Sequence, residues 1–265
     1  MSSADGKTAL ITGGGSGIGR AAAARLRRAG CRVYEMSRRD VESGDAVHIR
    51  GDVTAPDDVG RAVKRVIEIE GRLDILVCNA GMGIAGAAEF TPPDDARAQF
   101  DVNYFGAVNA VSASLEYLRA GRGVVVFVSS VAAKLPVPFQ AHYSASKAAL
   151  NAFALALANE VRPFGVRVRV VMPGDTATGF TAARRRAQRD GADYGGRDIR
   201  AVAVMERDER RGMTADRVAA AVVRAATCRR APPLRAAGCR YKLFCALAKL
   251  LPARLSNWIV GRIYA

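Results

Sequence analysis

A tyrosine and a lysine stand four positions apart in the stretch HYSASKAAL (142–150), with only small residues between them. In a helix, Tyr143 and Lys147 lie on one face, one turn apart. A free tyrosine ionises at about pH 10, and a nearby ammonium group favours the phenolate and lowers that pKa. The pair therefore has the chemistry of a tuned acid and base, or it simply faces solvent. The rest of the chain decides between these two interpretations.

Short apolar runs rich in β-branched residues alternate with helical patterns along the chain. The runs cover 7–12, 32–37, 46–50, 73–79, 123–130, 166–173 and, more weakly, 232–238. This alternation predicts an α/β fold, a doubly wound parallel sheet of about seven strands with helices on both faces. Since no internal repeat or Pro/Ser-rich linker interrupts the pattern, we expect one domain over 1–265.

Two segments break this rhythm. Residues 175–215 are polar and Arg-rich without a clear strand, and we expect them to form a substrate lid. Residues 241–265 show two short amphipathic patterns split by Pro252, and proline suits the start of a helix.

The composition excludes several classes of protein. The formal net charge is +15, but the arginines are interleaved with Asp and Glu and no basic-aromatic motif appears, so we expect no nucleic-acid binding. No run of eighteen apolar residues and no signal-peptide pattern is present, which predicts a cytoplasmic protein. Five cysteines without a CxxC motif indicate reduced thiols, and we expect neither disulfides nor a metal site.

The stretch TGGGSGIG (12–19) follows the first predicted strand and opens a helix. Glycines permit a tight turn there, and the N-terminus of the helix offers free N–H groups to a pyrophosphate. The plain G-x-G-x-x-G spacing does not fit. The candidate cofactor-binding residues of this turn are Thr12, Gly13, Gly15, Ser16, Gly17, Ile18 and Gly19.

The second predicted strand ends in Ser37, Arg38 and Arg39. Dinucleotide folds that prefer NAD place Asp or Glu at about this point to hold the ribose 2′-OH. A guanidinium can instead clamp a 2′-phosphate, so the sequence favours NADP(H) over NAD(H). The alternative is that both arginines only face solvent.

Taken together, these stretches resemble the classical short-chain dehydrogenase/reductase family, up to about residue 240. The resemblance rests on seven motifs in the family's order, TGxxxGxG, an Asp-hydrophobic pair, NAG, a helix asparagine, a serine at the family's spacing before the tyrosine, YxxxK and PGxxxT. Beyond the residues already given, the motifs add Asp52, Val53, Asn79, Ala80, Gly81, Asn103, Ser130, Pro173, Gly174, Thr176 and Thr178.

The resemblance implies a Rossmann-like fold and a homodimer or homotetramer that associates through long helices. It also implies that Asn103, Ser130, Tyr143 and Lys147 form the catalytic set. Tyr143 would be the general acid for ketone reduction, with its pKa lowered by Lys147 and the nicotinamide. Ser130 would hydrogen-bond the substrate oxygen. Lys147 would also hold the nicotinamide ribose, and Asn103 would order a water that links Lys147 to solvent.

The substrate is less well determined, because the family hosts many substrates on one fold. The apolar and basic tail over 241–265 favours an apolar lid for a bulky ketone or secondary alcohol, such as a steroid or lipid. Packing on a partner subunit and a contact with a membrane surface stay open for the same segment. A 3-oxoacyl-(acyl-carrier-protein) reductase and a non-catalytic dinucleotide-binding sensor or scaffold are the alternative functions.

Overall fold

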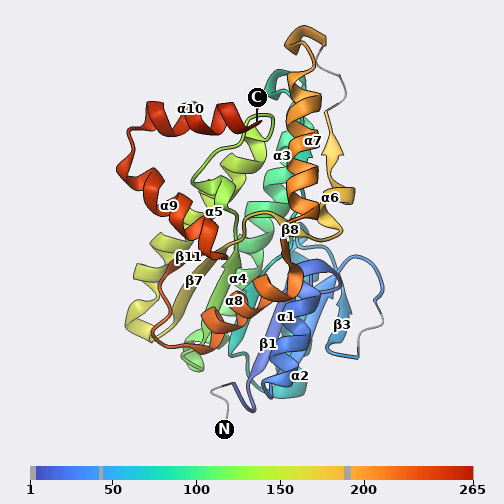
Figure 1. The fold of residues 1–265 in the computed structure, drawn as a ribbon. Coiled ribbons are helices and arrows are strands. Elements are labelled where there is room, and N and C mark those ends of the chain that lie inside the picture. Colours follow the sequence, from blue (N-terminus) through green and yellow to red (C-terminus); the bar gives the residue numbers. More distant parts are fainter. Residues whose placement is uncertain (1–3, 42–43, 188–191, 265) are drawn as a thin grey trace.

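The structure is a computed structural model and describes residues 4–41, 44–187 and 192–264. Its centre is a parallel seven-stranded sheet in the order β11-β7-β6-β4-β1-β2-β3 (Figure 1). The strands are β1 (Thr8–Thr12), β2 (Arg32–Ser37), β3 (Val47–Arg50), β4 (Ile75–Cys78), β6 (Val124–Val128), β7 (Arg167–Met172) and β11 (Leu234–Ala236). Every predicted apolar run forms one of these strands, so the predicted fold class is confirmed.

Helices cover both faces of the sheet. The helices α2 (Pro56–Glu70), α4 (Gly106–Ala120) and α5 (Ala141–Glu160) pack on one face, and α1 (Gly17–Arg28) and α8 (Ala215–Thr227) pack on the other. Alternate side chains of a strand point to opposite faces. In β1, Leu10 therefore joins one core, while Ala9 and Ile11 join the other. Because both faces are buried, the strands read as continuous apolar runs.

The strand order reverses between β1 and β4, which are hydrogen-bonded neighbours. From β1 the chain runs outward to β2 and β3, and then returns to β4 on the opposite side. In open parallel sheets, ligands bind in the crevice outside the carboxyl ends of the strands at such a switch point. This edge of the sheet carries the glycine-rich turn after β1 and the NAG motif after β4.

The segment 175–215 is more regular than the sequence predicted. It contains α6 (Phe180–Ala183), α7 (Arg197–Arg210) and the two-residue strands β8 (Thr176–Ala177), β9 (Arg185–Arg186) and β10 (Met213–Thr214), while 188–191 lie outside the described residues. The 14-residue α7 was not predicted, because most of its residues are charged and only a few of its side chains are buried, so its apolar periodicity is weak. Arg, Ala, Met and Glu favour helices, and Glu206 pairs with Arg210 one turn further on at 3.2 Å.

The remaining elements are short or join others. The helix α3 (Pro93–Phe100) continues through a π-helical turn, η2 (Asp101–Phe105), into α4. The strand β5 (Ile84–Ala85) pairs with β9, and β8 pairs with β10. The single turns of 3₁₀ helix are η1 (Ala88–Phe90), η3 (Val131–Ala133), η4 (Arg162–Phe164) and η5 (Ala192–Tyr194).

Two helices follow the last strand, as the amphipathic patterns predicted. The helix α9 (Cys239–Leu250) runs outward from β11, and α10 (Ala253–Tyr264) turns back at Pro252 and packs against α7 (Figure 1). Across the described parts of the chain, no helix has the length and apolar character needed to cross a membrane.

Candidate active site

The glycine-rich turn and the NAG motif are joined by hydrogen bonds at the switch point. The Asn79 side-chain amide donates to the carbonyl oxygens of Thr12 at 3.1 Å and Gly13 at 2.9 Å. In return, the Thr12 hydroxyl accepts from the backbone N–H groups of Asn79 and Ala80 at 3.1 and 3.2 Å. Two motifs that stand far apart in the sequence therefore form one rigid rim of the cleft.

The glycines of this turn are required by close approaches. A Cβ atom on Gly19 would lie 2.3 Å from the Gly13 carbonyl oxygen, and one on Gly13 would lie 2.9 Å from the Ala80 Cα atom. Gly17 has φ +51°, which L side chains rarely adopt. Ser16 is the residue before α1, and its side chain makes no capping hydrogen bond. The Ser16 hydroxyl therefore does not occupy the first N–H groups of α1. This geometry fits the pyrophosphate of a dinucleotide.

The end of β2 forms the far part of the cleft, where Ser37, Arg38 and Arg39 line it as predicted. Their neighbours Asp40 and Asp52 bring carboxylates that the end of the strand itself lacks. Each carboxylate has a cationic neighbour. The Arg38 guanidinium lies 4.0 Å from Asp52, and Asp40 lies 3.5 Å from the Arg50 guanidinium.

A buried carboxylate beneath this turn escaped the sequence reasoning. Glu35 is fully buried in β2, where its side chain contacts His48 of β3 and accepts a hydrogen bond from the Ser37 hydroxyl at 3.3 Å. A Cβ atom on Gly14 would lie 2.4 Å from the Glu35 Cβ atom. A glutamate within an otherwise apolar strand run was the available signal.

The predicted catalytic residues converge at the carboxyl end of β6. Ser130 follows that strand, and Tyr143 and Lys147 lie on α5, all three lining the same cleft. The Lys147 side chain is buried and its Nζ atom donates to the Val128 carbonyl oxygen at 3.1 Å. Ser129 donates to the Lys147 carbonyl oxygen at 3.2 Å and ties β6 to α5.

The acid–base properties of this pair differ from the expectation. Burial raises the pKa of Tyr143 to about 12, while a hydrogen bond to Ser130 acts in the opposite direction. Burial lowers the pKa of Lys147 to about 8. In the chain by itself, burial therefore outweighs the lowering of the tyrosine pKa that is expected from Lys147. The Lys147 ammonium lies 6.0 Å from the centre of the Tyr143 ring, and it does not offset the desolvation of the phenol.

Asn103 lies in the π-helical turn between α3 and α4, a feature that often marks functional sites. Its amide nitrogen donates to the Met82 carbonyl at 3.0 Å and to the Ser146 hydroxyl at 3.1 Å, and its oxygen accepts from the Met82 N–H at 2.8 Å. A Cβ atom on Gly81 would lie 3.1 Å from the Asn103 oxygen and 3.4 Å from the Lys147 Nζ atom. Asn103 thus holds the chain after NAG beside Lys147.

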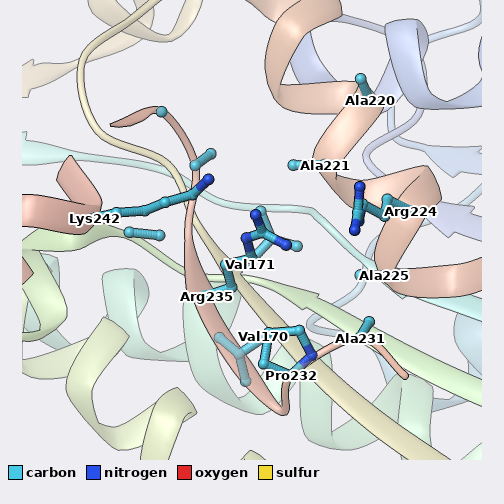
Figure 2. Close-up of a pocket in the computed structure, with 13 residues that line it drawn as sticks. Val170, Val171, Ala220, Ala221, Arg224, Ala225, Ala231, Pro232, Arg235 and Lys242 are labelled. Atoms are coloured by element: carbon cyan, nitrogen blue, oxygen red, sulfur yellow. The ribbon is translucent and has the colours of Figure 1, made fainter. Parts of the chain in front are cut away.

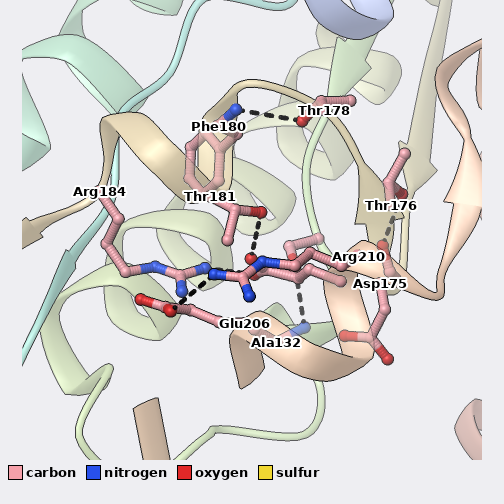
Figure 3. Close-up of polar contacts among 12 residues, drawn as sticks. Ala132, Asp175, Thr176, Thr178, Phe180, Thr181, Arg184, Glu206 and Arg210 are labelled. Atoms are coloured by element: carbon pink, nitrogen blue, oxygen red, sulfur yellow. Dashed lines mark hydrogen bonds and ion pairs between the residues drawn. The ribbon is translucent and has the colours of Figure 1, made fainter. Parts of the chain in front are cut away.

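Two further predicted motifs complete the cofactor side of the cleft. The Asn109 side chain on α4 donates to the Val53 carbonyl at 2.9 Å and fixes the Asp52-Val53 pair. After β7, the Pro173 carbonyl accepts from the Val131 N–H at 2.8 Å. The Thr176 hydroxyl donates to the Gly174 carbonyl at 2.8 Å. The Thr178 hydroxyl accepts from the N–H of Phe180, the first residue of α6, at 3.2 Å (Figure 3).

The cleft has a volume of about 1090 Å³ and continues past these motifs into a second part, walled by later helices. The Phe180 ring lies 5.9 Å from the Tyr143 ring, centre to centre, and begins this part. The residues that the helices α7, α9 and α10 contribute to the wall are Met205, Asp208, Glu209, Arg240, Tyr241, Phe244, Val260, Ile263 and Tyr264.

Two contacts that the sequence did not reveal hold this second wall. Glu209 of α7 pairs with the buried Arg184 guanidinium and accepts from the Thr181 hydroxyl at 2.6 Å, which joins α7 to α6. The Tyr241 hydroxyl of α9 donates to the Asp175 carboxylate at 2.6 Å. These partners are separated by long stretches of sequence and carry no local motif, so only the folded chain identifies them.

A doubly wound sheet with a glycine turn at its switch point and a Ser/Tyr/Lys group facing the same cleft defines a dinucleotide-binding oxidoreductase. The short chain dehydrogenase family model matches residues 7–189. The chain belongs to the short-chain dehydrogenase/reductase family, whose fold binds NAD(P).

Individual relatives agree with this placement. The chain is 39% identical to the 3-ketodihydrosphingosine reductase of Bacteroides thetaiotaomicron over 230 aligned residues. The aligned region covers 85% of each protein. It is 32% identical to dehydrogenase/reductase SDR family member 7B of Xenopus tropicalis, over 96% of this chain and 84% of that protein. A short-chain dehydrogenase structure from Streptomyces avermitilis superposes with a TM-score of 0.83 at 30% identity, over 97% of each chain.

Proposed function

We propose that this oxidoreductase uses NADP(H) to interconvert a ketone and a secondary alcohol on a long, apolar, lipid-like substrate. The observation that carries the proposal is the two-part cleft. Its cofactor motifs and its Ser130, Tyr143 and Lys147 group open directly onto a wall of apolar side chains from α9 and α10. The relative named for reduction of 3-ketodihydrosphingosine, itself a long-chain ketone, supports the substrate class.

Three side chains divide the work of ketone reduction. The glycine-rich turn and Lys147 would hold the nicotinamide cofactor, which would supply the hydride for the carbonyl carbon. Ser130 donates a hydrogen bond to the carbonyl oxygen, and Tyr143 then delivers its phenolic proton to that oxygen. Because burial holds the pKa of Tyr143 at about 12, the phenol is protonated at neutral pH and ready to act as the acid. The Lys147 ammonium stabilises the phenolate that forms and takes part in replacing its proton.

The preference for NADP(H) follows from the charges at the end of β2. The nearby Asp52 and Asp40 have cationic neighbours, while the Arg38 side chain is 74% exposed and keeps room to move toward a 2′-phosphate. Such a phosphate would complete a bidentate clamp by the Arg38 guanidinium.

The test is a screen of ketones that differ in the bulk of their apolar part, with NADPH or NADH as the reductant. We expect a long-chain 3-keto sphingoid base to give the largest kcat/KM with NADPH, above short ketones, sugars, steroid ketones and 3-oxoacyl thioesters. A preference for 3-oxoacyl thioesters would establish the acyl-carrier-protein alternative. Tight cofactor binding without turnover of any ketone would establish the sensor alternative.

A point substitution separates the apolar wall from the chemistry. Phe244→Ala removes a ring that lines the cleft, and we expect it to raise KM for the long-chain ketone at least tenfold while leaving a short ketone unchanged. Leu243→Ala is the matched control, because Leu243 is 58% exposed on the same helix and does not line the cleft. Equal effects of the two variants would refute the assignment of the wall.

We also propose a homodimer or homotetramer that associates through α4 and α5. Phe105, the last residue of η2 just before α4, is 49% exposed, and Leu155 on α5 is 42% exposed, so apolar side chains lie at the surface beside both helices. Light scattering checks the mass, and Leu155→Arg should shift it toward the monomer. A monomeric wild-type protein at micromolar concentration would contradict this proposal.

A further inference from the structure

The outer face of the two C-terminal helices is unusually apolar for a protein surface. In the described part of the chain, eight of the fourteen most exposed large apolar side chains lie on α9 and α10. They are Leu243, Phe244, Leu247, Leu250, Leu255, Trp258, Ile259 and Ile263, of which Phe244 and Ile263 also line the cleft. Leu250 is 82% exposed and Trp258 is 59% exposed, so the fold itself leaves these side chains uncovered.

These side chains form stripes along each helix. On α9, Leu243, Leu247 and Leu250 are spaced by four and three residues, and this spacing places them on one face. On α10, Trp258 and Ile259 follow Leu255 by three and four residues, which also places them on one face. The opposite side of α10 carries Val260, which is buried and lines the cleft, so the helix is covered on one side only.

The charge around these stripes has a single sign. From 217 to the C-terminus the chain contains ten Lys and Arg residues and no Asp or Glu. Lys249 and Arg254 flank the turn between α9 and α10, and the Arg262 guanidinium lies 5.6 Å from the centre of the Trp258 ring. Amphipathic helices that carry cations beside Trp and Leu side chains typically bind in the interfacial region of an anionic bilayer.

A small pocket beside the start of α9 adds to this positive charge. It has a volume of about 150 Å³ and lies between β7, β11 and α8. Arg224, Arg235 and Lys242 line it, and Figure 2 shows all three side chains turned toward the same space. Among the described residues no carboxylate lines the pocket, and an anionic phosphate group is the chemistry that would neutralise these cations.

We propose that α9 and α10, with the adjoining cationic pocket, dock onto the surface of an anionic lipid bilayer. A second copy of this chain is a poorer occupant, because it would bring the same cations face to face. Since Phe244, Val260 and Ile263 of the same helices line the cleft, docking places the substrate wall beside the bilayer. That consequence rests on the proposed function, whereas docking itself does not.

The chain contains a single tryptophan, Trp258, and this permits a direct test on the full-length protein. Vesicles of phosphatidylcholine, alone or mixed with phosphatidylglycerol, are added while Trp258 emission and cosedimentation are measured. We expect a blue shift and sedimentation with the anionic vesicles only, and weaker binding as salt is raised. No binding to anionic vesicles at low salt would overturn the proposal, whatever the outcome of the ketone screen.

Matched variants locate the surface. Leu247→Glu should weaken binding to the anionic vesicles at least tenfold, whereas Ile69→Glu on α2 should not, although the two side chains are 45% and 47% exposed. Lys242→Ala and Arg235→Ala should each weaken binding roughly fivefold. Lys64→Ala, on α2, is their control. If Leu247→Glu changes the mass measured by light scattering and leaves vesicle binding intact, the face belongs to a second copy and the proposal is wrong.

Discussion

The two walls of the cleft are built in different ways. The cofactor wall is held largely by hydrogen bonds that involve the main chain at strand ends, such as those between Asn79, Thr12 and Gly13. The substrate wall comes from α6, α7, α9 and α10, and side-chain contacts such as Arg184–Glu209 hold its parts together. Each of these cofactor-wall bonds has one partner in the main chain, which a substitution does not remove, while a contact between two side chains can be lost through either partner. The comparison teaches that this chain can keep its chemistry while its substrate wall varies.

The two walls also differ in how their apolar surface is covered. The helices beside the cofactor wall bury their apolar faces on the sheet, as α1 does with Ala22 and Leu26. The helices α9 and α10 bury Cys245 and Val260 but leave most of their large apolar side chains exposed. The first arrangement supplies stability, and the second leaves surface available for a ligand or partner.

The strongest way to break the cofactor wall is to remove its proton donor. Tyr143→Phe should lower kcat by roughly 10³-fold or more, because general acid catalysis is lost while the ring shape is kept. Cofactor binding, followed by fluorescence titration, should be unchanged. Tyr117→Phe, a residue packed against the core away from the cleft, is the control. A kcat close to that of the wild type would remove Tyr143 from the acid role.

Breaking the buried ion pair tests the substrate wall. Glu209→Gln leaves the Arg184 guanidinium buried without a full charge partner, because that side chain is only 1% exposed. We expect a loss of about 3 kcal/mol in the free energy of unfolding by urea. Asp94→Asn, in the exposed pair with Arg97, should cost almost nothing. Equal losses in the two variants would show that burial of the pair does not matter.

The pH dependence of stability sharpens the comparison for the cofactor wall. The folded-state pKa of Lys147 is lowered to about 8, below its unfolded value, so between these two values the unfolded chain binds the extra proton. Stability should therefore rise with pH through this window. We expect wild type to gain about 1–2 kcal/mol over Lys147→Met between pH 7 and 9.5 in urea titrations. An unchanged difference between the two proteins would mean that Lys147 is not desolvated.

The smallest expected effect concerns the choice of cofactor. Arg38→Ala should raise KM for NADPH about tenfold and change KM for NADH little, because only NADPH offers a 2′-phosphate to the guanidinium. Arg97→Ala is the control, since Arg97 forms an exposed ion pair with Asp94 on α3 and does not line the cleft. A wild-type protein that binds NADH more tightly than NADPH would contradict the preference itself.

The sequence by itself determined the sheet and the glycine-rich turn, and its resemblance to the family implied the grouping of Ser130, Tyr143 and Lys147. Runs buried on both faces leave a continuous apolar signal, and glycine turns and motif spacings are local properties of the chain. Only the tertiary structure revealed α7, the Arg184–Glu209 and Tyr241–Asp175 contacts and the Glu35 carboxylate beneath the turn. It also set the direction of the Tyr143 pKa, because desolvation depends on what surrounds the phenol and not on the lysine four residues away.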